Sequence, residues 1–385
     1  MTPHPVPRQE GQVTRAGQLD ILDDILARAA AEPRALTREE RATLLGLESP
    51  ADVGRLFKAA YALKVKYCGR TVAMRGIVEA GNVCAKDCLY CGIRKSNGNV
   101  ERYSLDADEI VRLARFDAER GYASLVIQSG EVEGEAHTRF IEDVLRRIAP
   151  LGLGVTLSLG EQTEEVYRRW REAGAERYLL RIETSSRALY AKLHPEGHSF
   201  DRRVECLRAL RRCGYQVGTG VMCALPGQTA LDLADDIGFF ADIDADMIGM
   251  GPFIPHPDTP LGGEPFDAER RLAAGLKMIA VTRLHLHDVN IAAATALQAL
   301  AHDGRERGIL AGANVIMPNI TDVRYRRGYQ LYSNKPCLDE NASLCAACLE
   351  RRLAAIGEGV GYGARGDSLH YRLRAGLARP GGGQS

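Results

Sequence analysis

Three cysteines stand close together in the run Cys84-Ala-Lys-Asp-Cys88-Leu-Tyr-Cys91, with C-x3-C-x2-C spacing. Thiolates bind zinc or iron, and iron–sulfur clusters are usually held by four of them. No fourth thiol follows nearby, so a four-iron cluster at this motif would leave one iron open to a small molecule. The alternative is a structural zinc site, although zinc motifs usually repeat C-x2-C or pair it with His at a set distance.

A second group of cysteines, Cys337, Cys345 and Cys348, has C-x7-C-x2-C spacing near the end of the chain. Zinc, a second iron–sulfur cluster and unmetallated thiols are all physically allowed there. The iron–sulfur motif upstream favours a cluster over zinc. The four remaining cysteines are scattered and are typical of small core residues.

Polar groups follow several apolar runs that we predict to be strands. The second run ends in Gln128-Ser129-Gly130-Glu131, and the fourth contains Arg181 and Glu183. Side chains alternate along a strand, so Arg181 and Glu183 face the same side, as do Thr156 and Ser158. An inward arginine is costly to bury without a partner. The pair is therefore either a structural ion pair or a binding site for a zwitterionic ligand.

Eight apolar runs alternate with amphipathic helical stretches after Lys66. The predicted strands are Ala73–Ala80, Ala123–Gly130, Gly154–Gly160, Arg177–Thr184, Gln216–Cys223, Met247–Phe253, Asn290–Leu297 and Ala313–Asn319. Strand–helix alternation predicts parallel strands, and eight of them close a barrel whose chemistry lies at their carboxyl ends. An open doubly wound sheet is the alternative.

The predicted organisation places this barrel at residues 71–320. A disordered leader (1–18) and an N-terminal helical cover (19–70) precede it, and Leu36-Thr37-Arg38-Glu39-Glu40 has the pattern of a helix-capping box. A C-terminal extension (321–375) carries the second cysteine group, and a disordered tail (376–385) follows.

Composition argues against several kinds of partner. The chain has 385 residues, with 50 Lys plus Arg and 50 Asp plus Glu, so no basic excess indicates nucleic acid or an anionic membrane. No apolar run approaches the ~18–20 residues of a membrane span, and the first residues lack a secretory pattern. Ten cysteines without such a signal predict a reducing, cytoplasmic location.

The first cysteine run, with Tyr90 before its third cysteine, resembles the cluster motif of the radical S-adenosylmethionine (SAM) enzymes. The wider sequence resembles the HydE family of [FeFe]-hydrogenase maturases, which belongs with biotin synthase and methylornithine synthase in one barrel subgroup. The resemblance runs from about Lys66 to the late three hundreds. The segments that carry it are Cys84–Arg94, Gln128–Glu131, Val155–Glu161, Arg177–Thr184, Leu225–Thr229, Gly251–Pro260, Gly312–Asn319, Tyr329–Tyr332 and the second cysteine group.

This resemblance implies a radical SAM (β/α)8 TIM-type barrel in which Cys84, Cys88 and Cys91 hold a 4Fe–4S cluster. In the family the open iron chelates SAM, and one electron cleaves a C–S bond to release a 5'-deoxyadenosyl radical. The residues expected around SAM are Tyr90, Gln128, Ser129, Gly130, Glu131, Glu183 and Arg203. Those expected to line the substrate region are Thr156, Arg181, Thr295, Tyr329 and Tyr332.

The implied substrate is an organometallic iron–cysteine carbonyl–cyanide precursor supplied by the maturase HydG. The product goes towards the diiron subcluster of the hydrogenase, assembled on the scaffold HydF, and a reductant such as ferredoxin or flavodoxin supplies electrons. Two positions depart from the family pattern, Ala294 for a threonine and Ile182 where a histidine can occur. Alternatives are another enzyme of the subgroup acting on a small organic substrate, or an iron–sulfur carrier, which would not need Arg181 and Glu183.

Overall fold

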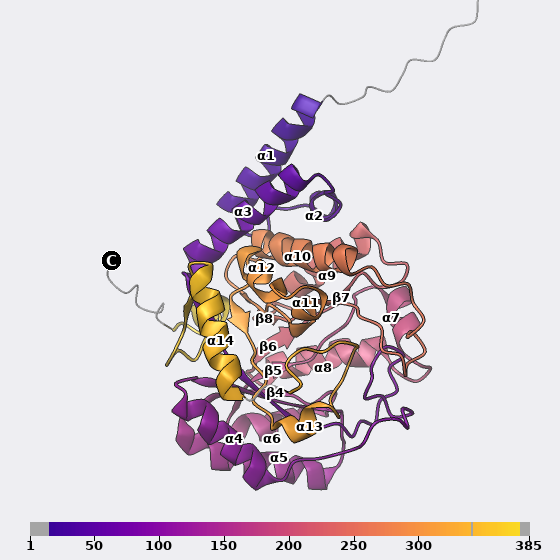
Figure 1. Ribbon diagram of the computed structural model, residues 1–385, viewed down its shortest axis with the longest axis vertical. Coiled ribbons are helices and arrows are strands. Elements are labelled where there is room, and N and C mark those ends of the chain that lie inside the picture. The colour runs from indigo at the N-terminus through magenta and orange to yellow at the C-terminus, as the bar shows by residue number, and fades with distance from the viewer. Residues whose placement is uncertain (1–14, 340–341, 378–385) are drawn as a thin grey trace, which may run out of the picture.

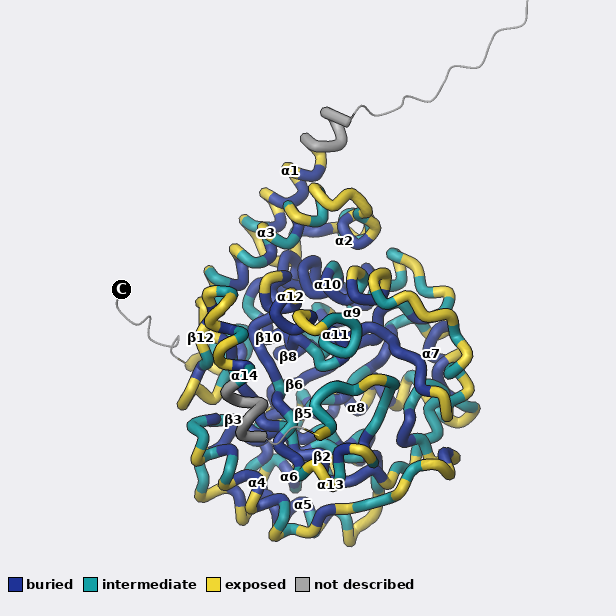
Figure 2. The backbone as a smooth tube through the Cα atoms, viewed as in Figure 1, coloured by how far each residue is buried: buried dark blue, intermediate teal, exposed yellow. Residues whose placement is uncertain are grey.

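The computed structural model of the chain describes residues 15–339 and 342–377. Parallel strands occupy its centre and helices surround them, while three N-terminal helices project to one side (Figure 1). The burial pattern follows this arrangement, because the central segments are buried and exposed residues lie at the periphery (Figure 2).

Seven parallel strands form one curved sheet in the order β10-β8-β6-β5-β4-β3-β2. Their bounds are β2 (Gly76–Gly81), β3 (Ser124–Ser129), β4 (Gly154–Ser158), β5 (Ala175–Leu179), β6 (Gln216–Thr219), β8 (Met247–Ile248) and β10 (Asn290–Ile291). Each lies within one of the predicted runs or begins within two residues of it.

An eighth parallel segment joins the two edges of this sheet. Strand β11 (Val315–Ile316) is bridged to Ala292 beside β10, and Asn319 just beyond it is bridged to Ile77 in β2. The amide of Ile77 also donates to the carbonyl of Pro318 at 2.8 Å. Both edges therefore bond to the same segment, which confirms the predicted eight-stranded barrel and excludes the open sheet.

Helices connect these strands and pack around them. They are α4 (Ala107–Glu119), α5 (Glu135–Ile148), the 3-10 turn η1 (Ala149–Leu151), α6 (Glu164–Glu172), α7 (Arg187–Leu193), α8 (Phe200–Arg212), α9 (Ala230–Asp242), α10 (Ala268–His285), α11 (Thr295–Leu300) and α12 (Gly304–Leu310). Polar N-caps start several of them, since the side chains of Asp106, Thr163, Ser199 and Thr229 each accept a backbone N–H.

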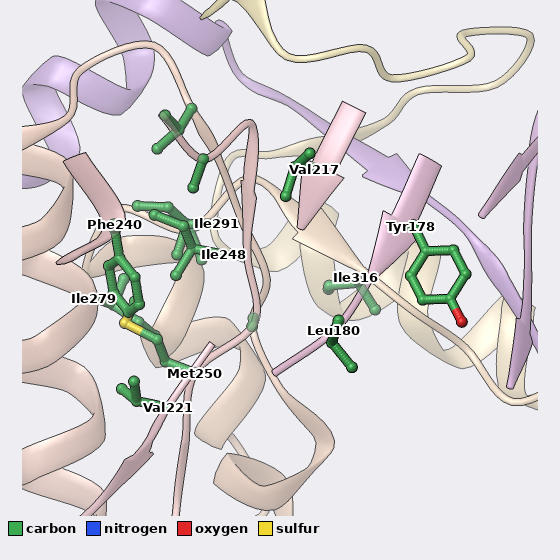
Figure 3. Close-up of a cluster of buried hydrophobic side chains, with 14 of the residues drawn as sticks. Tyr178, Leu180, Val217, Val221, Phe240, Ile248, Met250, Ile279, Ile291 and Ile316 are labelled. Atoms are coloured by element: carbon green, nitrogen blue, oxygen red, sulfur yellow. The ribbon is translucent and has the colours of Figure 1, made fainter. Parts of the chain in front are cut away.

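The apolar core fills the space between the strands and these helices. Figure 3 shows Ile248 and Ile291 from the strands beside Phe240 of α9 and Ile279 of α10, with Val217 apart from them on β6, the strand next to β8. All five side chains are at most 1% exposed. Burial of this kind, at about 25 cal/mol per Å² of apolar surface, is the main stabilising contribution to the barrel.

The predicted strands are longer than the observed ones, and some of them are interrupted. Strand β6 ends at Thr219, and two residues separate it from β7 (Met222–Cys223); β8 ends at Ile248, and two residues separate it from β9 (Gly251–Pro252). A Cβ on Gly220 would overlap the carbonyl oxygen of Gly249, so the two chains approach too closely here for a regular ladder. The prediction of strand as far as Leu297 is wrong, because Thr295 begins α11.

The helices α1 (Arg15–Ala31), α2 (Arg38–Leu45) and α3 (Pro50–Cys68) pack on the outside of α9 and α10. The predicted capping box is confirmed: Thr37 accepts from the Glu40 amide, and the Glu40 carboxylate accepts from the Thr37 amide. Helix α1 begins inside the range expected as a disordered leader. The other residues of that leader, and most of the expected tail, lie outside the described ranges.

The C-terminal extension covers both ends of the barrel. It contains β12 (Gly359–Val360), α13 (Val323–Arg326), α14 (Ala342–Ala355) and α15 (Leu369–Arg374), and β12 pairs with β1 (Thr71–Met74), which also pairs with β11. The carbonyl of Gly366 accepts from Asn290 at 2.8 Å, at the amino end of β10. Helices in the described ranges are too short or too polar to cross a membrane.

Candidate active site

The first cysteine group lies on the segment between β2 and α4, at the carboxyl end of the barrel. Cys84, Cys88 and Cys91 all line one cavity of about 340 Å³. The same cavity reaches into the barrel between residues of β3, β5 and the segment after β10. The chemistry-bearing residues therefore meet at the end of the barrel where the sequence pattern predicted them.

The loop that carries the cysteines packs tightly on the end of β3. A Cβ on Gly130 would overlap the carbonyl oxygen of Val83 and lie 2.8 Å from the Cβ of Cys84. The amide of Glu131 donates to the Cys84 sulfur at 3.4 Å, and the amide of Ala85 donates to the Glu131 carbonyl at 2.8 Å. Glycine at position 130 is therefore a requirement of this contact.

Burial makes all three thiols reluctant to ionise. It raises the pKa of Cys88 to about 12 and also raises the pKa of Cys84 and Cys91. A thiol in this setting loses its proton when a metal centre stabilises the thiolate. Three such thiols on one cavity wall are a donor set that suits iron.

A network of charges fixes the rim beside the cysteines. Lys86, inside the cysteine motif, lies 3.2 Å from Glu131 and 3.1 Å from Glu161. Burial acts to raise the pKa of Glu161, but Arg203 and Lys86 outweigh it and hold this pKa below its ordinary value. Burial raises the pKa of Glu131, although the Glu161 amide donates to it at 2.8 Å.

Arg181 and Glu183 lie on the cavity wall and form an ion pair at 2.9 Å. The strand ends at Leu179, so the predicted alternation does not run through them, yet both side chains face the cavity. Glu183 has φ of +68°, a left-handed conformation that is rare outside glycine. Its backbone is bound on both sides, because its amide donates to Gly220 and its carbonyl accepts from Met222.

The opposite wall comes from β2, β3 and the C-terminal extension. Gln128 donates to the Tyr329 hydroxyl at 3.1 Å. Lys335 forms a buried ion pair with Glu79 and donates to the Tyr329 carbonyl at 2.7 Å. The extension is tied to the cysteine loop as well, since the Gly92 amide donates to the Leu331 carbonyl at 3.0 Å. Segment 329–335 therefore forms part of the cavity wall.

Most residues expected at the site line this one cavity. They are Cys84, Cys88, Tyr90, Cys91, Gln128, Ser129, Gly130, Glu131, Arg181, Glu183, Arg203, Thr295, Tyr329 and Tyr332. Thr295 also accepts a hydrogen bond from Arg305 at 2.8 Å.

Thr156 is the exception among these expected residues. It lines a smaller cavity of about 20 Å³ deeper in the barrel, together with Arg75 and Asn290. Its buried hydroxyl has no hydrogen-bond partner among the described residues.

The second cysteine group is described only in part. Cys337 and Cys348 are half-buried, and the side chain of Cys345 lies outside the described residues. Within the described ranges, no three His, Cys, Asp or Glu side chains converge as ligands of a single metal ion.

Several residues of the site were not singled out from the sequence. Lys86 and Glu161 lie inside quoted motifs, but their mutual contact spans 75 positions. Glu79 and Lys335 meet across 256 positions. The sequence offered two signals for these contacts, a lysine within the cysteine motif (Lys86) and a glutamate within a predicted strand (Glu79). Neither signal predicts which residue forms the ion pair with it.

Comparison with known proteins identifies a family. Residues 78–240 match the model of the Radical SAM superfamily. The chain is 44% identical to the [FeFe] hydrogenase maturase subunit HydE of Thermotoga maritima over 330 residues, which is 86% of this chain and 93% of that protein.

Solved structures show the same fold. Methylornithine synthase (PylB) is 26% identical with a TM-score of 0.76, and the match covers 92% of this chain and all of that one. The FeFe-hydrogenase maturase HydG of Carboxydothermus hydrogenoformans superposes with a TM-score of 0.77 at 17% identity, covering 93% of this chain and 82% of that one.

Proposed function

The chain belongs to the HydE family of radical SAM enzymes, and from this membership we propose that it acts in the maturation of [FeFe]-hydrogenase. The observation that carries the proposal is the 44% identity to a HydE maturase over nearly the whole length of that protein. The cavity supports it, because the cysteines, the charged rim and the tyrosines expected from the family meet there.

Cys84, Cys88 and Cys91 would hold the 4Fe–4S cluster of the family. Three half-buried cysteines along one wall, with an N–H donated to the Cys84 sulfur, fit such a cluster. When bound, the cluster and SAM together supply a one-electron cleavage that yields methionine and a 5'-deoxyadenosyl radical. In this proposal the cysteine loop holds the metal, and the rim positions the methionyl end of SAM beside it.

The charged groups of the rim suit a zwitterion. Glu131 and Glu183 offer acceptors to an ammonium group, while Arg181 and Arg203 supply positive charge for a carboxylate. Arg203 is held by Glu161 at 2.5 Å and by the Arg181 carbonyl at 2.8 Å, so its guanidinium is pre-oriented. Ser129, Gln128, Gly130 and Tyr90 complete the proposed SAM site.

The substrate would occupy the wall formed by the extension. Tyr329 and Tyr332 come from that wall, Arg181 and Thr295 line the same cavity, and Thr156 lies deeper. Segment 329–335 lines the cavity beside the cysteine loop, and a reactive carbon radical requires a site from which water is excluded. We propose the iron–cysteine carbonyl–cyanide precursor as substrate, HydG as its supplier, HydF as the acceptor, and ferredoxin or flavodoxin as reductant. The cytoplasm is the proposed setting.

A second candidate is a methylornithine synthase-like reaction on a small organic substrate. The fold match to that enzyme covers its whole length, and Ala294 removes one hydroxyl expected in a HydE substrate site. A Cβ on Gly251 would make only an ordinary van der Waals contact with that of Ala294, at 3.5 Å, so the wall beside Ala294 has room for a methyl group.

Two measurements test the proposal. The reconstituted, reduced chain should cleave SAM to methionine and 5'-deoxyadenosine, and it should restore hydrogenase activity in cells that carry HydG and HydF but lack HydE. SAM cleavage without complementation would reject hydrogenase maturation and leave the second candidate.

A substitution at the rim tests the proposed SAM site. Glu183→Gln keeps the side-chain volume and removes the charge, so SAM affinity should fall about tenfold or more while thermal stability changes little. Unchanged SAM affinity with a large loss of stability would make the Arg181–Glu183 pair structural. Glu165→Gln, on the exposed face of α6, is the control.

A further inference from the structure

The guanidinium of Arg102 binds four backbone carbonyls of the cysteine loop, which we define as residues 82–97. Its Nη1 donates to Asn82 at 2.7 Å and to Ile93 at 2.9 Å, and its Nη2 donates to Arg94 at 2.7 Å and to Asn97 at 3.0 Å. One side chain thus connects the first residue of the loop, Asn82, to residues at its end, from Ile93 to Asn97.

Arg102 is itself held in place on the barrel. The Asn82 side chain accepts from the Tyr103 amide at 2.8 Å and donates to the carbonyls of Glu101 and Gly328 at 2.8 Å and 2.7 Å. Asn82 is fully buried. The backbone on both sides of Arg102 is therefore fixed against the end of β2, which gives the guanidinium a rigid base.

The charge of Arg102 has no carboxylate counterpart among the described residues, whereas its neighbour Arg94 pairs with Asp87 at 2.8 Å. Carbonyl oxygens satisfy the N–H donors without neutralising the cation. A 4Fe–4S cluster with three thiolate ligands is an anion. The uncompensated charge beneath the loop is therefore complementary to the group that the loop is proposed to hold.

We propose that Arg102 is a positioning residue that holds the cysteine loop in its cluster-binding shape before the cluster is present. This inference rests on the proposed assignment of the cluster to Cys84, Cys88 and Cys91. Ordering a loop of this length costs conformational entropy, and a loop ordered in advance does not draw that cost from the binding of the metal. The four-way contact requires the planar fork of arginine, which lysine does not provide.

The test uses the full chain in a Cys337→Ala, Cys345→Ala, Cys348→Ala background, so that iron reports on the first cysteine group alone. Hydrogen exchange is measured on the protein without cluster, and loss of iron to a chelator is measured after reconstitution. Both Arg102→Lys and Arg102→Met should speed exchange of the amides in residues 84–97 and speed iron loss, each by about tenfold or more. Amides of β3 and β4 serve as the internal reference.

Arg283→Lys is the matched control. The guanidinium of Arg283 also donates to three backbone carbonyls, those of Gly312, His287 and Val289. Arg283 lies in α10, and none of these carbonyls belongs to the cysteine loop. Its substitution should lower the melting temperature and leave both the exchange of the cysteine loop and the retention of iron unchanged.

Wild-type exchange and iron retention in both Arg102 variants would overturn the inference. Retention by Arg102→Lys with loss in Arg102→Met would also overturn it, since charge alone would then suffice. Cys88→Ser tests the underlying assignment separately. If that variant still binds a full four-iron cluster, the assignment of the cluster to Cys84, Cys88 and Cys91 fails. The hydrogen-exchange rates of the Arg102 variants still test whether Arg102 orders the loop.

Discussion

Some buried residues of this chain are charged, although an apolar side chain at the same position would cost less free energy to bury. Glu183 adopts a left-handed backbone, a strain of about 1–3 kcal/mol, and its carboxylate still meets Arg181 on the cavity wall. Strain and buried charge at one position are difficult to explain by packing. They are understandable where a ligand supplies the remaining contacts.

Asp117 is a different case, since it lies in α4 away from the cavity. It is fully buried beside Gly76, neither carboxyl oxygen has a hydrogen-bond partner among the described residues, and burial raises its pKa to about 8. The unfolded chain would ionise this group near pH 4. Between about pH 4 and 8 the folded state therefore holds a proton that the unfolded state releases, so stability falls as pH rises.

Asp117→Asn should remove this part of the pH dependence. We expect it to exceed the unsubstituted chain in melting temperature by a margin that grows from pH 5 to pH 8, because asparagine has no proton to take up and no charge to bury on folding. Thermal unfolding across pH 5–8 measures the effect, with exposed Asp108→Asn on the same helix as the control. Parallel curves for Asp117→Asn and the unsubstituted chain would contradict the prediction.

At the scale of elements, the end of β3 and the cysteine loop depend on each other's shape. The loop lies directly over Gly130, and the amide of Gly130 donates to the carbonyl of Gly81 at the end of β2 at 3.0 Å. Two strand ends and the loop therefore share one contact region. Changes there should alter metal binding as well as stability.

Gly130→Ala should push the loop away from β3 and lower stability by about 1–3 kcal/mol. Iron content after reconstitution should fall with it. Gly98→Ala is the matched control, because it lies just beyond the loop and its Cβ would meet no atom within 4 Å. Full iron content and unchanged stability in Gly130→Ala would show that the close approach is not required.

At the scale of the whole molecule, the C-terminal extension covers the amino end of the barrel. Arg177 of β5 is fully buried there, donates to the Arg365 carbonyl at 2.8 Å and pairs with Asp367. Arg75 lies nearby, and burial followed by the charge of Arg177 lowers its pKa to about 9. Asp367 therefore supplies the negative charge that this end of the barrel needs.

Asp367→Asn should leave Arg177 buried without a counter-charge and cost about 3 kcal/mol of stability. Burial acts to raise the pKa of Asp367, but Arg177 and Gln216 hold it below the ordinary value, so this stability is present at neutral pH and lost as pH falls below about 4. Urea unfolding at pH 7 is the measurement. SAM affinity should be unchanged, because the cysteines lie at the other end.

Asp201→Asn is the control for that substitution. Asp201 pairs with Arg187 on the surface, where an ion pair contributes about 0–1 kcal/mol. Equal losses in the two variants would contradict a special role for Asp367.

Local pattern was sufficient to predict the order of the elements. Apolar runs and the capping residue Thr37 reflect contacts within a few positions, so the barrel and the start of α2 could be predicted. Strand lengths could not, because the break at Gly220 depends on the approach of Gly249 from another strand. The family resemblance likewise pointed to the three cysteines and to most of the polar residues that line the cavity with them, but not to its apolar wall.

The partners of the charged groups depend on the tertiary structure. Lys86 with Glu161, Lys335 with Glu79 and Arg177 with Asp367 join positions 75 to 256 residues apart. Which carboxylate meets which cation depends on the order in which strands lie around the barrel and on where the extension crosses it. The periodicity of a sequence shows which face of a single helix or strand a residue occupies. A buried charge is stabilised by an oppositely charged residue that only the closed barrel places next to it, so its partner cannot be predicted from local pattern.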